Sequence, residues 1–346
     1  MIKITQVWTD TFKDFVDDVV NNISVITLII LDCLNEVDYY DKVFNKPDID
    51  KLLEVTQQYN VPVKILTANS NKNKGLDKFS HIEIIRWTTF WFCRTYSVWT
   101  YSETYEFNIK KGVDIRDPNV CKHFELTSPY ICLNNIAKQH RCVVMDMLAK
   151  HNLIKERAVT WRGIVRGDGT FNYTFKYWKP KLLILDQNLD VQFKQETMPT
   201  EFNHSFMQLV TESDDIDIFF SEKTATPIFL NKPFLVATCP GFHAELKKQG
   251  FELYDELFDY SFDDEPDMET RFDKLVQNLK PYIGLNQTEL KEKYDRVADK
   301  ISYNRKLAYY YAMNVPIDII KLHLLVDKNV TGYDGPLNII KHIYMG

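Results

Sequence analysis

Apolar runs alternate along the first third of the chain with segments whose apolar side chains recur at helical spacing. The segments Thr11–Asn21 and Asp48–Tyr59 have the spacing of amphipathic helices, with Asp48 as a candidate cap. Val25–Cys33 is almost unbroken in branched apolar residues, which is typical of a parallel strand buried on both faces. The apolar runs that predict strands are Ile2–Trp8, Val25–Cys33, Val63–Thr67 and Ile82–Arg86. This alternation predicts an N-terminal α/β domain with a parallel sheet.

The same pattern restarts near residue 130. A short apolar strand, Tyr130–Asn134, precedes the helix Cys142–Lys150, and a second buried strand ends at Val236. The later helices are predicted at Phe242–Gln249 with Gly250 after its end, at Met268–Leu279 capped by Asp263–Pro266, and at Thr288–Met313 as one long amphipathic helix. We therefore predict an α/β domain at residues 1–128, a second at 129–285 with a hairpin-like insert at 157–205, and a helical segment at 286–346.

Composition limits the chemistry that the chain can support. Its 346 residues are enough for two hydrophobic cores, and its six cysteines form no C-x-x-C pair, so we expect reduced core thiols and no zinc site. The chain has 11 glycines and no P-loop or G-x-G-x-x-G motif, which argues against a glycine-rich phosphate loop. The net charge of −6 argues against a general nucleic-acid-binding surface and leaves room only for a local basic groove.

Neither a secretory signal nor a membrane span is predicted. The N-terminal residues lack the apolar stretch of a signal peptide. The apolar run at residues 25–34 is far too short to cross a membrane. We expect a soluble, cytoplasmic protein.

The stretch from Met207 to Gly241 carries the most specific chemistry. It contains Glu212-Ser213, then a gap with several acids, then Ser221-Glu222-Lys223-Thr224 and the strand Pro233–Val236. A carboxylate followed by a lysine at a loop-to-helix junction suits a nucleotide sugar, because the carboxylate accepts from ribose hydroxyls and the ammonium meets the diphosphate. Helix N-terminal amides add anion affinity. The alternative is that Glu222-Lys223 is simply a solvated helix start.

These spaced elements resemble the C-terminal donor-binding motif of α1,3-fucosyltransferases and of related glycosyltransferases of phages and marine viruses, over roughly residues 130–280. The resemblance implies a GT-B-like architecture: two Rossmann-like domains facing a cleft, with C-terminal helices packing back on the N-terminal domain. It implies inverting transfer from a nucleotide diphosphate sugar, favouring a GDP-fucose-like donor, to a glycan or other hydroxyl acceptor. No cofactor is expected, and a viral chain of this kind would act in the host cytoplasm.

The resemblance also assigns residues to the donor site. Arg141, in the first turn of the predicted helix at 142–150, matches an arginine that contacts the donor diphosphate in these proteins. An arginine is unusual at a helix N-terminus, which favours acids, and an ion pair with Asp146 is the alternative explanation. We expect Arg141 and Lys223 to line a solvated cleft. The predicted donor-binding set is Asn134, Arg141, Glu212, Ser221, Glu222, Lys223 and Thr224.

The general base is the least determined part of the prediction. Inversion requires one base on the N-terminal side of the cleft, and the candidates are Glu103, Asp32 and Glu83, in that order. Asp32 closes the strongest apolar run, at the end of a strand where ligands bind. Glu103 follows the aromatic cluster Trp87–Trp99, which is either a platform for the sugar acceptor or, as we favour, a domain core or interdomain seam.

Metal independence is predicted, because cationic side chains can stabilise the leaving diphosphate. The D-x-D triplet Asp215-Ile216-Asp217 falls in the variable gap of the motif. Two other functions stay open from the sequence. One is a glycosyltransferase that modifies DNA bases, and the other is a non-catalytic sugar- or partner-binding protein on a transferase fold.

Overall fold

The computed structural model describes residues 2–6, 27–31, 53–68, 79–101, 114–122, 125–154, 158–163, 173–185, 198–213 and 215–315, with backbone only at 2–6, 27–31, 97–99 and 101. The chain forms two compact units. Unit 1 comprises residues 1–97, 216–220 and 311–346, and unit 2 comprises residues 98–215 and 221–310. The chain therefore changes unit at 97/98, 215/216, 220/221 and 310/311. The sequence-based boundaries at 128/129 and 285/286 remain a prediction.

Unit 1 contains an open sheet of four parallel strands. The strands β1 (Ile2–Gln6), β2 (Thr27–Leu31), β3 (Val63–Thr67) and β4 (Ile82–Arg86) pair in chain order. Residues 53–58 are helical and connect β2 to β3. Val63 and Leu66 are completely buried, as the apolar runs predict. The parallel α/β prediction is confirmed for this sheet, while the predicted helix at 11–21 and the cap Asp48 lie outside the described residues.

The aromatic cluster begins the helix α4 (Phe90–Tyr101) and packs into a core. Trp87, Phe90 and Phe92 are buried, and Trp91 packs edge-to-face against Phe219 with 5.9 Å between ring centroids. For these rings the core interpretation is confirmed, because burial leaves no face on which a sugar could stack. The side chain of Trp99 lies outside the described residues.

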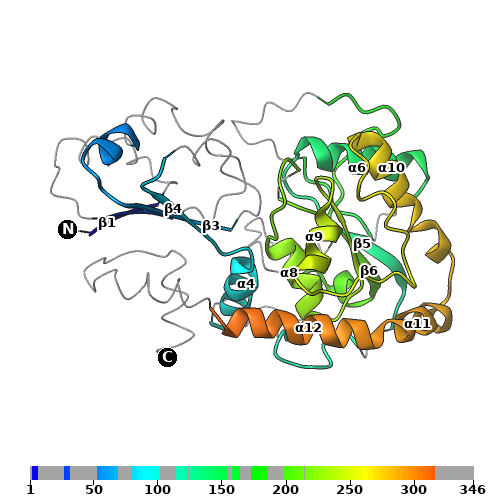
Figure 1. Ribbon diagram of the computed structural model, residues 1–346. Coiled ribbons are helices and arrows are strands. Elements are labelled where there is room, and N and C mark those ends of the chain that lie inside the picture. Colours follow the sequence, from blue (N-terminus) through cyan, green and yellow to red (C-terminus); the bar gives the residue numbers. More distant parts are fainter. Residues whose placement is uncertain are drawn as a thin grey trace. The chain divides into compact units, whose positions relative to one another are not determined.

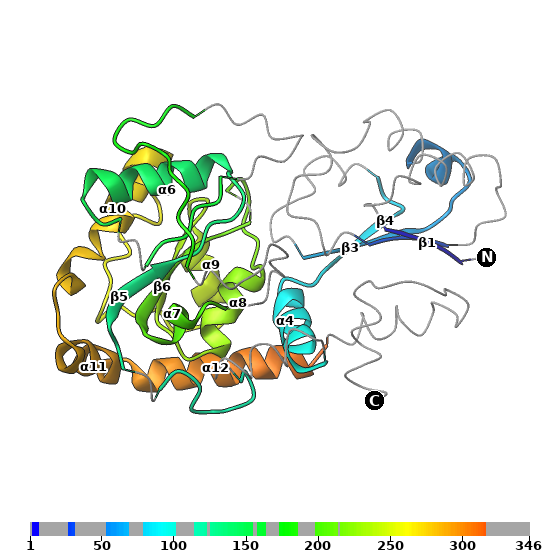
Figure 2. The same cartoon turned by 180° about the vertical axis from the view of Figure 1, so that it is seen from behind.

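Unit 2 is built on a second parallel sheet, with β5 (Ser128–Cys132), β6 (Ser205–Thr211) and β7 (Phe234–Ala237) in chain order. Every residue of β6 is buried. The helices α6 (Gln139–Lys150) and α10 (Met268–Gln277) lie side by side in Figure 1 and in Figure 2. The remaining elements are α7 (Thr200–Asn203), α8 (Glu222–Phe229), α9 (Phe242–Lys248) and the 3-10 helix η1 (Lys280–Tyr282). Two wholly parallel sheets with helices confirm the α/β class.

The described part of the 157–205 insert is held to α6 by Asp146. Its buried carboxylate accepts hydrogen bonds from the Tyr173 hydroxyl at 2.9 Å and from the amides of Lys176, Tyr177 and Trp178, each at 2.8 Å. Farther along, one antiparallel bridge joins residues 161 and 183. The predicted turn at residues 167–169 lies outside the described residues.

The predicted helix Thr288–Met313 is wrong as a single element. It is two helices, α11 (Gln287–Arg296) and α12 (Ala298–Met313), separated at Val297. Val297 leaves helical geometry, with φ −115°, while its side chain is completely buried. Its burial preserves the apolar spacing across the break, so the periodicity cannot detect the interruption.

The acids at 263–266 do not cap α10 as predicted. Asp267 is the N-cap residue and accepts from the Thr270 amide at 2.9 Å. Asp263 caps α9 instead, accepting from the amides of His243 at 3.1 Å and Ala244 at 3.0 Å. Gly250 follows α9 with φ +93°, as the sequence predicts for the residue after a helix.

Two composition-based expectations can be compared with the structure. Cysteines 93, 121, 132, 142 and 239 are free thiols and buried, as expected, while Cys33 lies outside the described residues. Within the described ranges, no helix is both long and apolar enough to cross a membrane.

Candidate functional site

The predicted donor-site residues gather at the carboxyl edge of the β5–β6–β7 sheet. Because the strands are parallel, their ends bring Asn134, Glu212 and Thr238 to one edge, which is where ligands bind in open α/β sheets. The Thr211 hydroxyl donates to Asn134 Oδ1 at 2.6 Å and ties the end of β6 to the loop after β5. Asn134 is completely buried, so its side chain positions the edge.

Glu212 organises the loop between β6 and α8. One carboxylate oxygen accepts from the Ser213 amide at 2.5 Å and from the Ser221 hydroxyl. The other accepts from the Ser221 amide at 2.9 Å and the Thr224 hydroxyl at 2.7 Å. Burial raises the pKa of the Glu212 carboxyl above its usual value, although the charge of Lys223 and these hydrogen bonds oppose the shift. Both oxygens are thus occupied by the protein, and Glu212 acts on a ligand only by positioning its neighbours.

Ser221 begins α8 as its N-cap residue. Its Oγ accepts from the Lys223 amide at 3.1 Å, and its carbonyl accepts from the Thr224 amide at 3.2 Å. These two amides are satisfied inside the protein, and the expected contribution of the helix N-terminus to anion binding remains a prediction. Ser221 and Thr224 fix the first turn of α8, which carries Glu222 and Lys223.

Arg141 is buried, with 4% of its surface exposed, and does not line a solvated cleft as expected. Its guanidinium donates to the carbonyls of Ile136 at 3.2 Å and Glu212 at 3.0 Å. His140 Nε2 also contacts the Glu212 carbonyl, at 2.8 Å. The carboxylate of Asp146, the alternative partner, accepts from residues 173–178. Arg141 thus holds the end of β6, and its contact with a donor diphosphate remains a prediction.

Glu222 and Lys223 form the part of the site in which one carboxylate oxygen lacks a hydrogen-bond donor. Glu222 is 3% exposed, and its Oε1 pairs with the ammonium of Lys223, which also donates to Ser213 Oγ at 2.6 Å. Within the described part of the chain, Glu222 Oε2 is buried and accepts no hydrogen bond. Glu222 is therefore not the solvated helix start that the sequence allowed. A buried carboxylate oxygen without a donor is costly, and a ligand hydroxyl would satisfy it.

Other charged side chains lie around the residues that contact Glu222. The ammonium of Lys138 donates to the Ser213 carbonyl, and a quarter of the Lys223 side chain is exposed. Asp215 Oδ1 lies 3.4 Å from His140 Nδ1. Burial raises the pKa of Asp215, but the hydrogen bond and charge of His140 outweigh it, so the pKa is below its usual value. Asp215 is thus an ionised partner of His140.

Of the three candidate bases, Glu83 alone lies within the described residues. Glu83 lies on β4 opposite Lys64 of β3 and forms an exposed ion pair with it. Such a carboxylate is held by a surface cation, which fits an ordinary strand pair. Asp32 and Glu103 lie outside the described residues, and their role as base remains a prediction.

Sequence reasoning missed three residues of this edge. Ser213, Lys138 and His140 contact the same loop as the predicted set. A polar residue at the end of an apolar strand is the signal that could have indicated Ser213. Lys138 and His140 act through backbone carbonyls of residues 212–213, about 70 positions away, which no local pattern reveals.

Comparison of the chain with protein-family models, with curated proteins and with solved structures finds no match. Any inference about function must therefore rest on the contacts at the sheet edge and on the motif resemblance.

Proposed function

We propose that this protein is a glycosyltransferase that binds a nucleotide diphosphate sugar at the carboxyl edge of the β5–β6–β7 sheet. The observation that carries the proposal is the buried Glu222 Oε2, which accepts no hydrogen bond in the described part of the chain and lies beside the ammonium-bearing Lys223. A carboxylate with one oxygen that lacks a donor, next to a cation, fits a ligand that carries both hydroxyls and negative charge.

Each residue has a distinct part in this proposal. Glu222 accepts from ribose hydroxyls, and Lys223 meets the diphosphate as a point charge. Glu212, Ser221 and Thr224 hold both side chains in place through the hydrogen bonds described above. This division separates ligand contacts from positioning contacts, which mutations can distinguish.

The proposed reaction is an inverting transfer. A base removes the proton of the acceptor hydroxyl, whose oxygen forms a bond to the anomeric carbon of the donor. The bond from that carbon to the diphosphate oxygen breaks at the same time, and the diphosphate leaves with the electron pair. Lys223 would stabilise its negative charge, so we propose metal-independent transfer in a GT-B-like arrangement. Glu103 and Asp32 are the proposed bases, and a GDP-fucose-like sugar is the favoured donor.

Nucleotide binding to the full chain tests the donor site. GDP or UDP should raise the melting temperature, because a ligand bound to the native state stabilises it. Lys223→Ala and Glu222→Gln should each weaken binding by about 1.5–3 kcal/mol, roughly 10- to 150-fold. The matched controls Lys306→Ala and Glu292→Gln alter exposed residues of the same unit and should leave affinity unchanged. Equal affinity in all four variants would remove the assignment of this edge.

Turnover tests the reaction itself. With a bound donor, release of the nucleoside diphosphate and of a glycosylated product should persist in excess EDTA. Collapse with chelator and recovery with Mn²⁺ would make the Asp215/Asp217 pair a metal-ligand candidate. Binding without any release, across saccharide and oligonucleotide acceptors, would favour a non-catalytic sugar-binding protein. Modification of the oligonucleotide alone would identify a DNA-base glycosyltransferase.

A further inference from the structure

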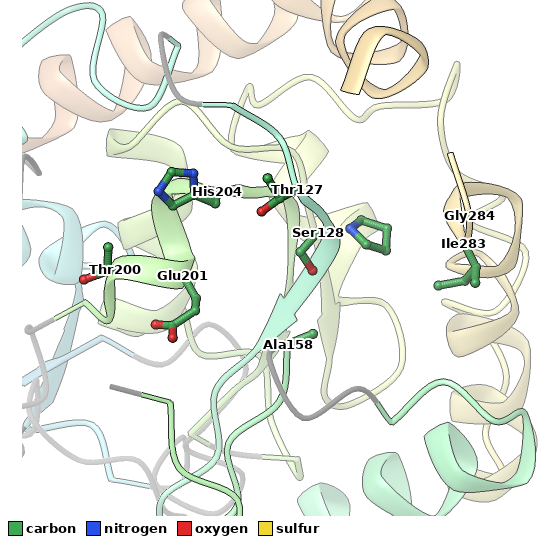
Figure 3. Close-up of a pocket in the computed structure, with 9 residues that line it drawn as sticks. Thr127, Ser128, Ala158, Thr200, Glu201, His204, Ile283 and Gly284 are labelled. Atoms are coloured by element: carbon green, nitrogen blue, oxygen red, sulfur yellow. The ribbon is translucent and has the colours of Figure 1, made fainter. Parts of the chain in front are cut away.

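A cavity opens at the amino edge of the β5–β6–β7 sheet, the end opposite the proposed donor site. It measures about 790 Å³, within the range of about 300–1,000 Å³ that is common for small-molecule pockets. Figure 3 shows residues of β5 and of the segment before it on one side and residues of α7 on the other. The lining residues are Thr127, Ser128, Pro129, Ala158, Thr200, Glu201, His204, Ile283 and Gly284.

Glu201 is a charged residue of this lining with one oxygen that lacks a donor. It is half-buried, and its Oε2 is buried with no hydrogen-bond partner among the described residues. The buried carboxylates of Glu212 and Asp146 each accept four hydrogen bonds, so Glu201 is unlike them. Removing an ionised oxygen from water without a donor is unfavourable, and a bound cation would offset that cost.

The Ser128 hydroxyl of the lining is suited to accept a hydrogen bond. The Ser128 hydroxyl donates to the Tyr130 carbonyl at 2.9 Å, so its lone pairs are what remain for a ligand. Among the residues that the structure describes, the nine that line the cavity include no lysine or arginine. The buried Lys232 of the same sheet edge is committed elsewhere, because its ammonium donates to the Ser205 carbonyl and lies 4.9 Å from the Phe202 ring centroid.

We propose that this cavity binds a small organic cation. Its cationic group pairs with Glu201, while its carbon chain packs on the apolar lining residues Pro129, Ala158 and Ile283. An organic cation fits better than a metal ion, since no three His, Cys, Asp or Glu side chains gather as metal ligands among the residues that the structure describes. The site is independent of the glycosyltransferase proposal, because it lies at the other edge of the sheet.

Calorimetric titration of the full chain with 1,4-diaminobutane at low salt tests the proposal. The uncharged isostere 1,4-butanediol is the ligand control, because it has the same length without the positive charge. The diamine should bind with a Kd of about 1 mM or tighter, and the diol at least about tenfold more weakly. Glu201→Gln, which keeps the shape of the side chain, should weaken the diamine at least about tenfold and leave the diol unchanged.

Glu252→Gln is the matched protein control, because it removes the same charge from an exposed position in the same unit. It should bind the diamine like the unaltered chain, and circular dichroism should confirm that both variants are folded. The proposal is overturned if the diamine does not bind, if the diol binds equally well, or if Glu201→Gln binds the diamine with unchanged affinity. Nucleoside diphosphate affinity should be the same in Glu201→Gln, which separates this site from the donor site.

Discussion

At the carboxyl edge of the β5–β6–β7 sheet, acidic side chains lie among cations, whereas the described residues that line the cavity at the amino edge include one carboxylate and no lysine or arginine. Glu222 shares its edge with Lys223 and Lys138, and Glu201 has no lysine or arginine beside it among the described lining residues. This contrast underlies the two proposals for one sheet: an anionic, hydroxyl-bearing ligand at the first edge and a cation at the second.

A second contrast lies within the carboxyl edge. Glu212 has donors for both carboxylate oxygens, while Glu222 has a buried oxygen without one. A buried acid whose hydrogen bonds are all made inside the protein contributes to stability. A buried acid with an oxygen that lacks a donor lowers stability until a ligand binds. Glutamate therefore has two different roles at positions 212 and 222.

The largest expected effect comes from replacing the two acids by glutamine. Glu212→Gln should lower the free energy of unfolding by about 2–4 kcal/mol, because an amide nitrogen would face two donors in a buried position. Glu222→Gln should change it by less than about 1 kcal/mol, because the substitution removes an ion pair but also an unsatisfied buried charge. Urea unfolding of the two variants measures the difference.

Equal destabilisation by the two substitutions would contradict the distinction between the acids. Glu292→Gln, at an exposed position of α11, corrects for the general effect of losing one negative charge.

Asp146 tests whether the behaviour of Glu212 is general for fully hydrogen-bonded acids. Asp146→Asn places an amide nitrogen among four donors and should lower the free energy of unfolding by about 2–3 kcal/mol. Three of those donors are backbone amides, so hydrogen exchange at Lys176, Tyr177 and Trp178 should become faster than in the rest of unit 2. Unchanged protection of these amides would show that Asp146 does not hold the segment.

The sequence predicts two strands of the first sheet at their observed limits because strand signals are local. Val63–Thr67 and Ile82–Arg86 are found at their observed limits, since each is a short apolar run bounded by polar residues. The break at Val297 is missed because a change of one residue's backbone angles leaves the apolar spacing intact. Asp263 is assigned to the wrong helix because a cap is identified by its position in sequence, while its amide partners lie about 20 residues earlier.

The sequence predicts which residues form the candidate site but not what each of them does. Glu222-Lys223 is visible as an acid–lysine pair at a helix start, which is a local signal. The hydrogen bonds that occupy the Glu212 carboxylate come in part from donors 9 and 12 residues away. They lie across a loop whose path the sequence does not encode locally. The Glu201 cavity combines segments near residues 128, 158, 201 and 283, so only the folded chain brings it together.

The smallest expected effect concerns the cation of the amino edge, Lys232. Burial lowers the pKa of Lys232 to about 8 in the folded protein, below the usual lysine value of about 10.4 in the unfolded chain. Between these values the unfolded state binds more protons, so the contribution of Lys232 to stability rises with pH and is lost as pH falls through about 8. Lys232→Met removes this dependence. Relative to the variant, the unaltered chain should therefore gain stability between about pH 8 and 10, by at most about 1.4 kcal/mol per pH unit. Urea unfolding across this range measures the slope, and Lys306→Met, at an exposed position, should retain it. Parallel stability profiles for the unaltered chain and Lys232→Met would mean that the buried ammonium does not lose its proton there, and the amino edge would then keep the charge of Lys232 throughout.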